Sequence, residues 1–294
     1  MEPHVGCDQS QVSQGRKVSK LKTADSPSGK EETAQGFCLT KYYLDAVADN
    51  GDYFVGYSAN LRFKHLSIGY ADALHSSELH GFKPGPSFGH GPEPVWDSKG
   101  LTWHHPKLGI EGSWLPLAPP WKTKLLSTAE GHVTWNCIQP GSKVLLKTGA
   151  GQIVEALGYC ELLTLTIPPW RLGLKELTWG RFVSATQSVV WIDWRGENEL
   201  RLVLWNGTPT DLADISENKV TTNDFTISVA PVKTLRQGFF GPNILSKVPK
   251  ILHLAPTALL QVHETKQLGH GVLEMPDGHQ EKGWVIYETI VWPD

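Results

Sequence analysis

Two side chains with chemical potential lie two positions apart in the middle of this chain, a carboxylic acid at Glu161 and a phenol at Tyr159. If the segment is a strand, alternation places both on the same face. The surrounding stretch also contains indoles, at Trp135, Trp170 and Trp179. A carboxyl group in an apolar aromatic environment can stay protonated at neutral pH and act as a strong local acid. Glu161 is therefore the first candidate for a catalytic proton donor.

A structural role for the same acid stays open. Glu161 could accept the guanidinium group of Arg181 and form a buried ion pair. The pKa of a paired carboxyl is depressed, so it could not serve as the acid. The two roles differ in whether Glu161 faces a cavity free of Arg181.

The motifs of this region follow one another in a characteristic order. They are His132-Val-Thr-Trp135-Asn-Cys-Ile-Gln-Pro140-Gly-Ser-Lys-Val144, Gly158-Tyr159-Cys160-Glu161, Pro168-Pro169-Trp170 and Leu177-Thr-Trp179-Gly-Arg181. This order resembles the central block of the carotenoid 1,2-hydratase (hydroxyneurosporene synthase) family and its lipocalin-like relatives. Those proteins show a Trp-x-Pro-Ile-x-Pro-x-x-x-Val run, a Gly-Tyr-x-Asp element and a Trp-x-Arg.

The resemblance extends to individual residues. Glu161 stands where the hydratases carry Asp. Asp45 follows an aromatic pair much as an Asp does near the start of their first domain, so the resemblance makes Asp45 a second candidate catalytic carboxylate. The hydratases place a catalytic His two residues before the Trp, whereas His132 lies three before Trp135. Because this shift turns a strand side chain to the opposite face, His132 is either a candidate base or a hydrogen-bonded core or rim histidine.

The resemblance implies acid–base catalysis of hydratase (lyase), isomerase or cyclase type on a hydrophobic, isoprenoid or polyketide-derived small molecule. Glu161 would protonate an electron-rich double bond, while Tyr159 and the indoles would flank the carbocation. The expected substrate-binding residues are Trp135, Trp170, Trp179 and Arg181. The alternative is a non-catalytic, lipocalin-like binder or carrier of such a ligand, because one fold can host both functions.

Charge and composition narrow the classes of partner. The formal net charge of -3 argues against a nucleic-acid partner held by phosphate contacts. No stretch approaches 18 uninterrupted apolar residues, so we expect no transmembrane segment and leave peripheral membrane contact open. There is no N-terminal apolar signal region, and a cytoplasmic protein is expected. The cysteines have no CxxC spacing: Cys7, Cys38, Cys137 and Cys160.

Signatures of cofactor and metal sites are missing from the sequence. It contains no phosphate-binding loop, dinucleotide fingerprint or Ser/His/Asp elbow, so we expect no cofactor. The histidines at His80, His90, His104 and His105 have no supporting Cys or carboxylate spacing, so we expect no metal site. Glu288 lies between Ile286 and Ile290 on one apolar face and must be paired or functional.

Apolar periodicity of two residues predicts an all-β fold. Residues 53–63 alternate between an apolar face and a mostly polar one. Residues 187–194 and 199–205 flank a short turn and indicate a hairpin, while 284–292 is apolar on both faces and should be covered on both sides. The family resemblance implies two lipocalin-like (calycin) antiparallel β-barrels, or sandwiches, packed side by side.

Domain boundaries follow from composition. Residues 1–35 are polar and aperiodic and are expected to be a disordered leader. The first lipocalin-like domain is expected over 36–150 and the second over 151–294. Residues 75–120 are dense in Gly, Pro and His, which predicts an irregular lid or binding loop.

Deleting residues 1–35 should leave the melting temperature nearly unchanged. The segment lacks the apolar residues needed to offset an ordering cost of about 1–2 kcal/mol per residue. Thermal melts of the full and shortened chains check this. A drop of many degrees would mean that the segment docks on the folded domain.

Overall fold

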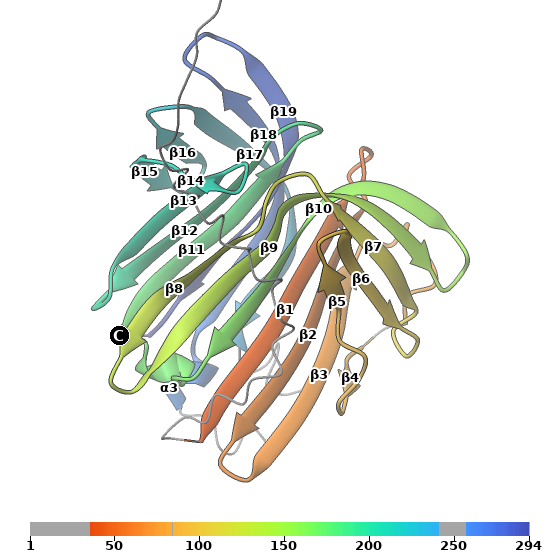
Figure 1. The fold of residues 1–294 in the computed structure, drawn as a ribbon, viewed down its shortest axis with the longest axis vertical. Coiled ribbons are helices and arrows are strands. Elements are labelled where there is room, and N and C mark those ends of the chain that lie inside the picture. The colour runs from red at the N-terminus through yellow and green to blue at the C-terminus, as the bar shows by residue number, and fades with distance from the viewer. Residues whose placement is uncertain (1–35, 84, 241–256, 294) are drawn as a thin grey trace, which may run out of the picture. The chain divides into compact units, whose positions relative to one another are not determined.

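The computed structural model describes residues 36–83, 85–240 and 257–293, all within the compact unit Thr33–Asp294 (Figure 1). The expected leader, residues 1–35, lies outside the described residues. The described chain forms two antiparallel sheets of ten and nine strands. The prediction of an all-β fold with two antiparallel sheets is confirmed.

The first sheet takes in the N-terminal strands. Its order is β4-β3-β2-β1-β10-β9-β7-β6-β5, and β8 pairs with β9 outside this path. The strands are β1 (Phe37–Val47), β2 (Tyr53–Phe63), β3 (Leu66–His75), β4 (Ser87–Phe88), β5 (Val95–Asp97), β6 (Gly100–His105), β7 (Ile110–Pro116), β8 (Trp121–Thr128), β9 (Gly131–Thr148) and β10 (Ile153–Leu165).

The second sheet has the order β14-β13-β12-β11-β19-β18-β17-β16-β15. Its strands are β11 (Leu174–Val183), β12 (Ser188–Gly196), β13 (Leu200–Trp205), β14 (Thr208–Pro209), β15 (Leu212–Ser216), β16 (Lys219–Thr222), β17 (Thr226–Phe239), β18 (His263–Glu274) and β19 (Gln280–Val291). The described residues also form two short helices, η1 (Pro169–Arg171) and α3 (Thr257–Leu260). Among the described residues, no helix has the length and apolarity needed to cross a bilayer.

Each sheet curls around a core of its own. In the first sheet, Phe54 on β2 packs in one cluster with Trp103 on β6 and Trp114 on β7. The Trp114 indole N–H also donates to the Asp45 carbonyl oxygen at 2.9 Å, although β7 and β1 are not neighbours in the sheet. A comparable cluster fills the second sheet. Curling therefore buries both faces of the central strands.

The structure refines one sequence-based expectation and corrects another. The mostly polar face of residues 53–63 is covered at its beginning, because Phe54 on that face is fully buried in the first sheet's own core. Residues 75–120 are not irregular throughout, because β5, β6 and β7 lie within them. On β6, Leu101, Trp103 and His105 are buried and alternate with exposed neighbours. The Gly and Pro residues hid this short period-two pattern.

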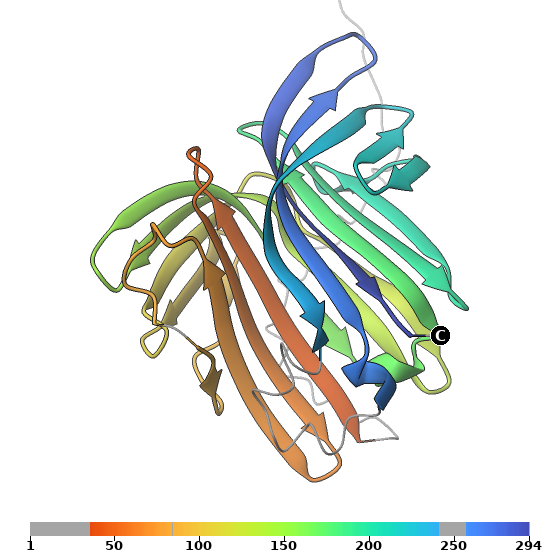
Figure 2. The ribbon, with the colours of Figure 1, turned by 180° about the vertical axis from the view of Figure 1, so that it is seen from behind.

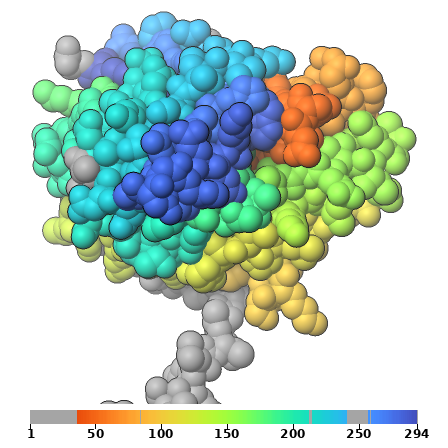
Figure 3. Space-filling model, turned by 90° about the horizontal axis from the view of Figure 1, so that it is seen from above, coloured from red at the N-terminus to blue at the C-terminus, as the bar shows by residue number. Residues whose placement is uncertain are grey.

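A third core lies between the two sheets. It contains residues of β1, β2, β9 and β10 together with residues of β11, β12, β18 and β19. Figure 2 shows β17–β19 passing beside β1 and β2, and Figure 3 shows blue C-terminal residues next to orange N-terminal ones. The inter-sheet core is where side chains from both halves of the sequence meet.

The local elements agree with the sequence patterns. β12 and β13 form the expected hairpin, with Trp194 opposite Leu200. Asn206 and Gly207 both have positive φ in the next tight turn. The strands divide between the sheets after Leu165, so β10 belongs to the first sheet. The division into domains at residue 150 stays a prediction.

Candidate active site between the two sheets

An irregular stretch of β10 positions the candidate acid. The register of β10 against β9 shifts around Cys160, and such bulges re-aim side chains. Gly158 packs so closely on the Asp45 carbonyl oxygen that any side chain would collide with it. Tyr159 and Glu161 then point together into the inter-sheet core, as alternation predicts.

Glu161 is held by two neutral donors. Its Oε2 accepts hydrogen bonds from the Trp135 indole N–H at 2.6 Å and from the Tyr159 hydroxyl at 2.7 Å. Its side chain is only 7% exposed. Burial raises the pKa of Glu161, while the Lys41 ammonium and the two hydrogen bonds oppose the rise. Burial also raises the pKa of Tyr159 well above its usual value, so that phenol stays a donor.

Arg181 does not bind Glu161. Its guanidinium makes three contacts with the Asp45 carboxylate, the shortest 2.6 Å, and donates to the Trp284 carbonyl oxygen at 2.8 Å. Both members of the Asp45–Arg181 pair are fully buried. The pairing of Glu161 with Arg181 that the sequence left open is therefore wrong. The guanidinium instead joins β11 to β1 across the inter-sheet core.

A second buried cation lies beside the acid's aromatic neighbours. Lys266 on β18 forms an ion pair with Glu288 on β19 and is 1% exposed. Its ammonium sits 5.0 Å from the ring centre of Tyr43 and 5.3 Å from that of Trp179. Burial alone would raise the pKa of Glu288, but the ammonium groups of Lys266 and Lys41 hold it below its usual value. Glu288 is thus paired.

A third cation, Arg236, lies toward β2. The ion pairs Asp45–Arg181, Lys266–Glu288 and Arg236–Glu264, with the aromatic rings between them, form the buried cluster. Arg236 on β17 donates to Glu264 at 2.6 Å and to the Tyr57 hydroxyl at 3.2 Å. Its guanidinium lies 5.1 Å from the centre of the Tyr57 ring, which packs 5.6 Å from the ring of Tyr43. The Tyr57 and Tyr43 rings of the first sheet therefore link Arg236 to Lys266.

Polar atoms in this cluster lack partners. Among the described residues, the Trp179 indole N–H, the Arg236 Nε and the Glu264 Oε2 are buried without a hydrogen bond. The Tyr43 hydroxyl makes no hydrogen bond of ordinary geometry, although its interaction with the Asp45 carboxyl helps to oppose the rise in the Asp45 pKa that burial causes. Because buried polar groups in proteins are nearly always satisfied, such a concentration indicates a place for water or a polar ligand group.

Of the remaining candidate residues, Trp179 lies beside the aromatic partner of Glu161, whereas Trp170 and His132 contact other residues. Trp179 packs on Tyr159 with ring centres 5.4 Å apart, so it joins the acid. Trp170 instead contacts Phe37 and Phe63 near the start of β1. His132 contacts the Thr166 hydroxyl through its ring at 3.1 Å. Alternation turns His132 away from the face that carries Trp135, as the sequence spacing predicts.

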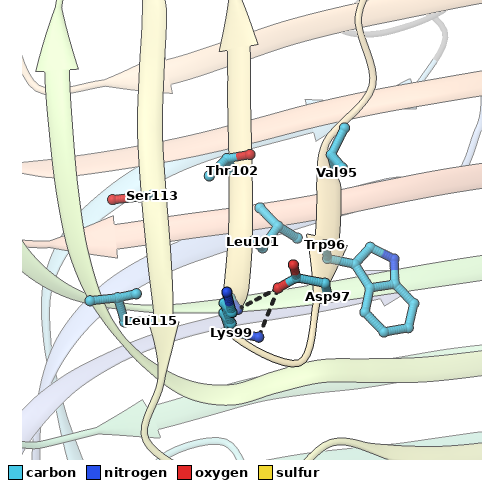
Figure 4. Close-up of a pocket in the computed structure, with 9 residues that line it drawn as sticks. Val95, Trp96, Asp97, Lys99, Leu101, Thr102, Ser113 and Leu115 are labelled. Atoms are coloured by element: carbon cyan, nitrogen blue, oxygen red, sulfur yellow. Dashed lines mark hydrogen bonds between the residues drawn. The ribbon is translucent and has the colours of Figure 1, made fainter. Parts of the chain in front are cut away.

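Surface hollows lie elsewhere in the first sheet. One of about 250 Å³ is lined by residues of β5, β6 and β7, and one of about 380 Å³ by residues of β6, β7 and β9 with Ile153. In the first, the Asp97 carboxylate accepts from the backbone N–H groups of Lys99 and Gly100 and stabilises a turn (Figure 4). Neither hollow contains Glu161 or its partners.

Two cations of the cluster, Lys266 and Arg236, do not stand out in the sequence. Glu264, Lys266 and Leu268 share one face of β18 by alternation, and a Lys two residues from a Glu on a partly apolar strand was the available signal. Tyr43 was visible only as part of the aromatic pair before Asp45. The described residues contain no group of three or more His, Cys, Asp or Glu side chains arranged to hold a metal ion.

Comparisons with known proteins give matches only among solved structures. No family model and no curated protein matches the chain. Among solved structures, a candidate AttH protein from Nitrosomonas europaea is 10% identical, with a TM-score of 0.49 over 90% of this chain and 98% of that chain. CghA with Sch210972 is 7% identical, with a TM-score of 0.46 over 87% and 88%.

Kievitone hydratase from Nectria haematococca is 12% identical, with a TM-score of 0.45 over 88% of this chain and 90% of that chain. All three identities and TM-scores are low. The likeness therefore carries no conclusion about the function of this chain.

Proposed function

We propose that this protein is an acid–base catalyst of hydratase, isomerase or cyclase type that acts on a hydrophobic small molecule held between the two sheets. The observation that carries the proposal is the environment of Glu161. Its carboxyl group is buried, has a raised pKa and is hydrogen-bonded only to the neutral donors Trp135 and Tyr159 among the described residues. A carboxyl in such surroundings can carry a transferable proton at neutral pH.

The hydrogen bonds indicate which oxygen would carry that proton. Oε2 of Glu161 already accepts from the Trp135 indole and the Tyr159 hydroxyl, so the proton of the neutral acid belongs on Oε1. Glu161 gives this proton to a double bond of the substrate and regains one from water or from the substrate. The two donors and the nearby Lys41 charge stabilise the carboxylate between these steps.

Native mass spectrometry of the protein from its own host tests this proposal. The Glu161→Gln variant should retain a hydrophobic compound that the wild type releases in converted form. A product heavier by one water molecule would indicate a hydratase, and an equal mass an isomerase or cyclase. The same unconverted ligand on both proteins would identify a carrier and contradict catalysis.

The stability of the protein should depend on pH through Glu161. Since burial raises the pKa of Glu161 above its usual 4.5, the folded state binds more protons than the unfolded state between these two values. The contribution of Glu161 to stability is therefore present at low pH and lost as pH rises through the raised pKa. Urea unfolding across this range should show the wild type losing stability relative to Glu161→Gln.

Glu155→Gln is the matched control for this pH effect, because Glu155 lies exposed on the same strand. Its pH profile should follow that of the wild type. Parallel profiles for wild type and Glu161→Gln would show that Glu161 titrates as an ordinary acid.

A further inference from the structure

The aromatic faces nearest to the acid already carry a cation. The ammonium group of Lys266 lies over both Tyr43 and Trp179, and Trp179 also packs on Tyr159. A carbocation formed beside Glu161 would compete with this ammonium for the same π-faces and would be repelled by its charge. The cluster therefore fits poorly with a plain hydrocarbon substrate that becomes a free carbocation.

Two of the unpartnered atoms, those on the rings that Lys266 lies over, are hydrogen-bond donors. The Trp179 indole N–H has no acceptor, and the Tyr43 hydroxyl makes no hydrogen bond of ordinary geometry, its nearest charged neighbour being the Asp45 carboxylate that Arg181 already holds. The two rings lie 5.1 Å apart and come from different sheets, β11 and β1. Two donors beside an ammonium group make a favourable place for an oxygen acceptor.

The cations of the three buried ion pairs beside these donors are already compensated, which favours a neutral acceptor over an anion at the two rings. Lys266, Arg236 and Arg181 each already have a buried carboxylate partner, in Glu288, Glu264 and Asp45 respectively. An anionic ligand group would find no uncompensated cation among these three pairs and would lose its hydration on entering. A carbonyl oxygen accepts two hydrogen bonds without bringing a charge.

We propose that Tyr43 and Trp179, with the Lys266 ammonium beside them, form a carbonyl-binding subsite. The substrate is then an unsaturated compound with a carbonyl group on its apolar skeleton. This inference rests on the proposed function, because it names the substrate class of the site that contains Glu161. The hydroxyl of Tyr43 and the indole N–H of Trp179 donate to the carbonyl oxygen and orient the double bond toward the acid.

Three probes of similar shape test the subsite. Benzylideneacetone carries a conjugated ketone, 1-phenyl-1-butene replaces the carbonyl by CH2, and cinnamyltrimethylammonium carries a cation. Tryptophan fluorescence titration should show the ketone binding about tenfold or more tightly than the alkene, the size expected for hydrogen bonds near a charge. The ¹³C signal of the labelled ketone carbonyl should move downfield on binding.

Tyr43→Phe is the informative variant, because the hydroxyl that it removes has no hydrogen-bond partner in the structure. The melting temperature should be unchanged, while ketone affinity falls several-fold and alkene affinity stays constant. Lys233→Met is the matched control, since Lys233 lies over the Tyr53 ring at an exposed position away from this pair. It should change neither affinity.

Equal affinity for ketone and alkene, no binding of the ketone, or tightest binding of the ammonium probe would each overturn the carbonyl subsite. Glu161→Gln separates the two proposals, because it should leave ketone binding intact. If the ketone preference holds while Glu161→Gln still converts the natural ligand, the subsite stands and the acid role fails.

Discussion

Replacing Glu161 by Gln should abolish turnover while the fold is retained. The amide oxygen can still accept from the Trp135 indole and the Tyr159 hydroxyl, so the free energy of unfolding near pH 5 should change by less than about 1 kcal/mol. The variant has no proton to transfer, and the rate should fall by about 10²–10⁴-fold, the usual contribution of a general acid. Single-turnover measurements with the ligand recovered from the host check the rate.

A ligand-binding assay and a thermal melt of the same variant should accompany the rate measurement, because they separate a catalytic carboxylate from a structural one. Glu161→Gln should bind the ligand as tightly as the wild type, since the side chain keeps its shape. Glu155→Gln, on the exposed part of the same strand, should behave as the wild type in every assay. Loss of several kcal/mol of stability in Glu161→Gln would instead reveal a structural carboxylate. Full activity would remove Glu161 from the mechanism.

Asp45→Asn should produce the largest loss of stability among single changes in the cluster. The variant leaves the fully buried guanidinium of Arg181 without its carboxylate. Breaking a buried ion pair from one side typically costs about 3–5 kcal/mol, because a charge remains buried without compensation. For a chain of this size the melting temperature should fall by roughly 10 °C. Urea unfolding of the variant and the wild type gives the free-energy difference.

Two further variants separate the charge effect from a general loss of packing. Glu111→Gln removes one member of an exposed ion pair with Lys147 and should cost less than about 1 kcal/mol. The double variant Asp45→Leu with Arg181→Met removes both buried charges and should recover most of the stability that Asp45→Asn loses. An Asp45→Asn protein as stable as the wild type would show that Arg181 finds other partners.

The strand pattern was readable because side-chain alternation is a local property. A period of two residues and turn residues such as Asn206-Gly207 identified the β12–β13 hairpin and the all-β class. The short strands β5–β7 could not be recognised from the apolar periodicity, because Gly and Pro residues interrupt the pattern and each strand is only partly apolar. Local signals also placed Tyr159 and Glu161 on one face and turned His132 away from Trp135.

The partners of the charged groups were decided by tertiary structure alone. Arg181 lies closer in sequence to Glu161 than to Asp45, yet β1 brings Asp45 to it from the other sheet. Lys266 reaches Tyr43 and Trp179 only because β18 passes against β1 in the inter-sheet core. Alternation tells which face a side chain takes, but not which of two sheets will cover that face. The sequence therefore determined the strands and the candidate acid, and the packing of the sheets determined that the acid stands free of Arg181.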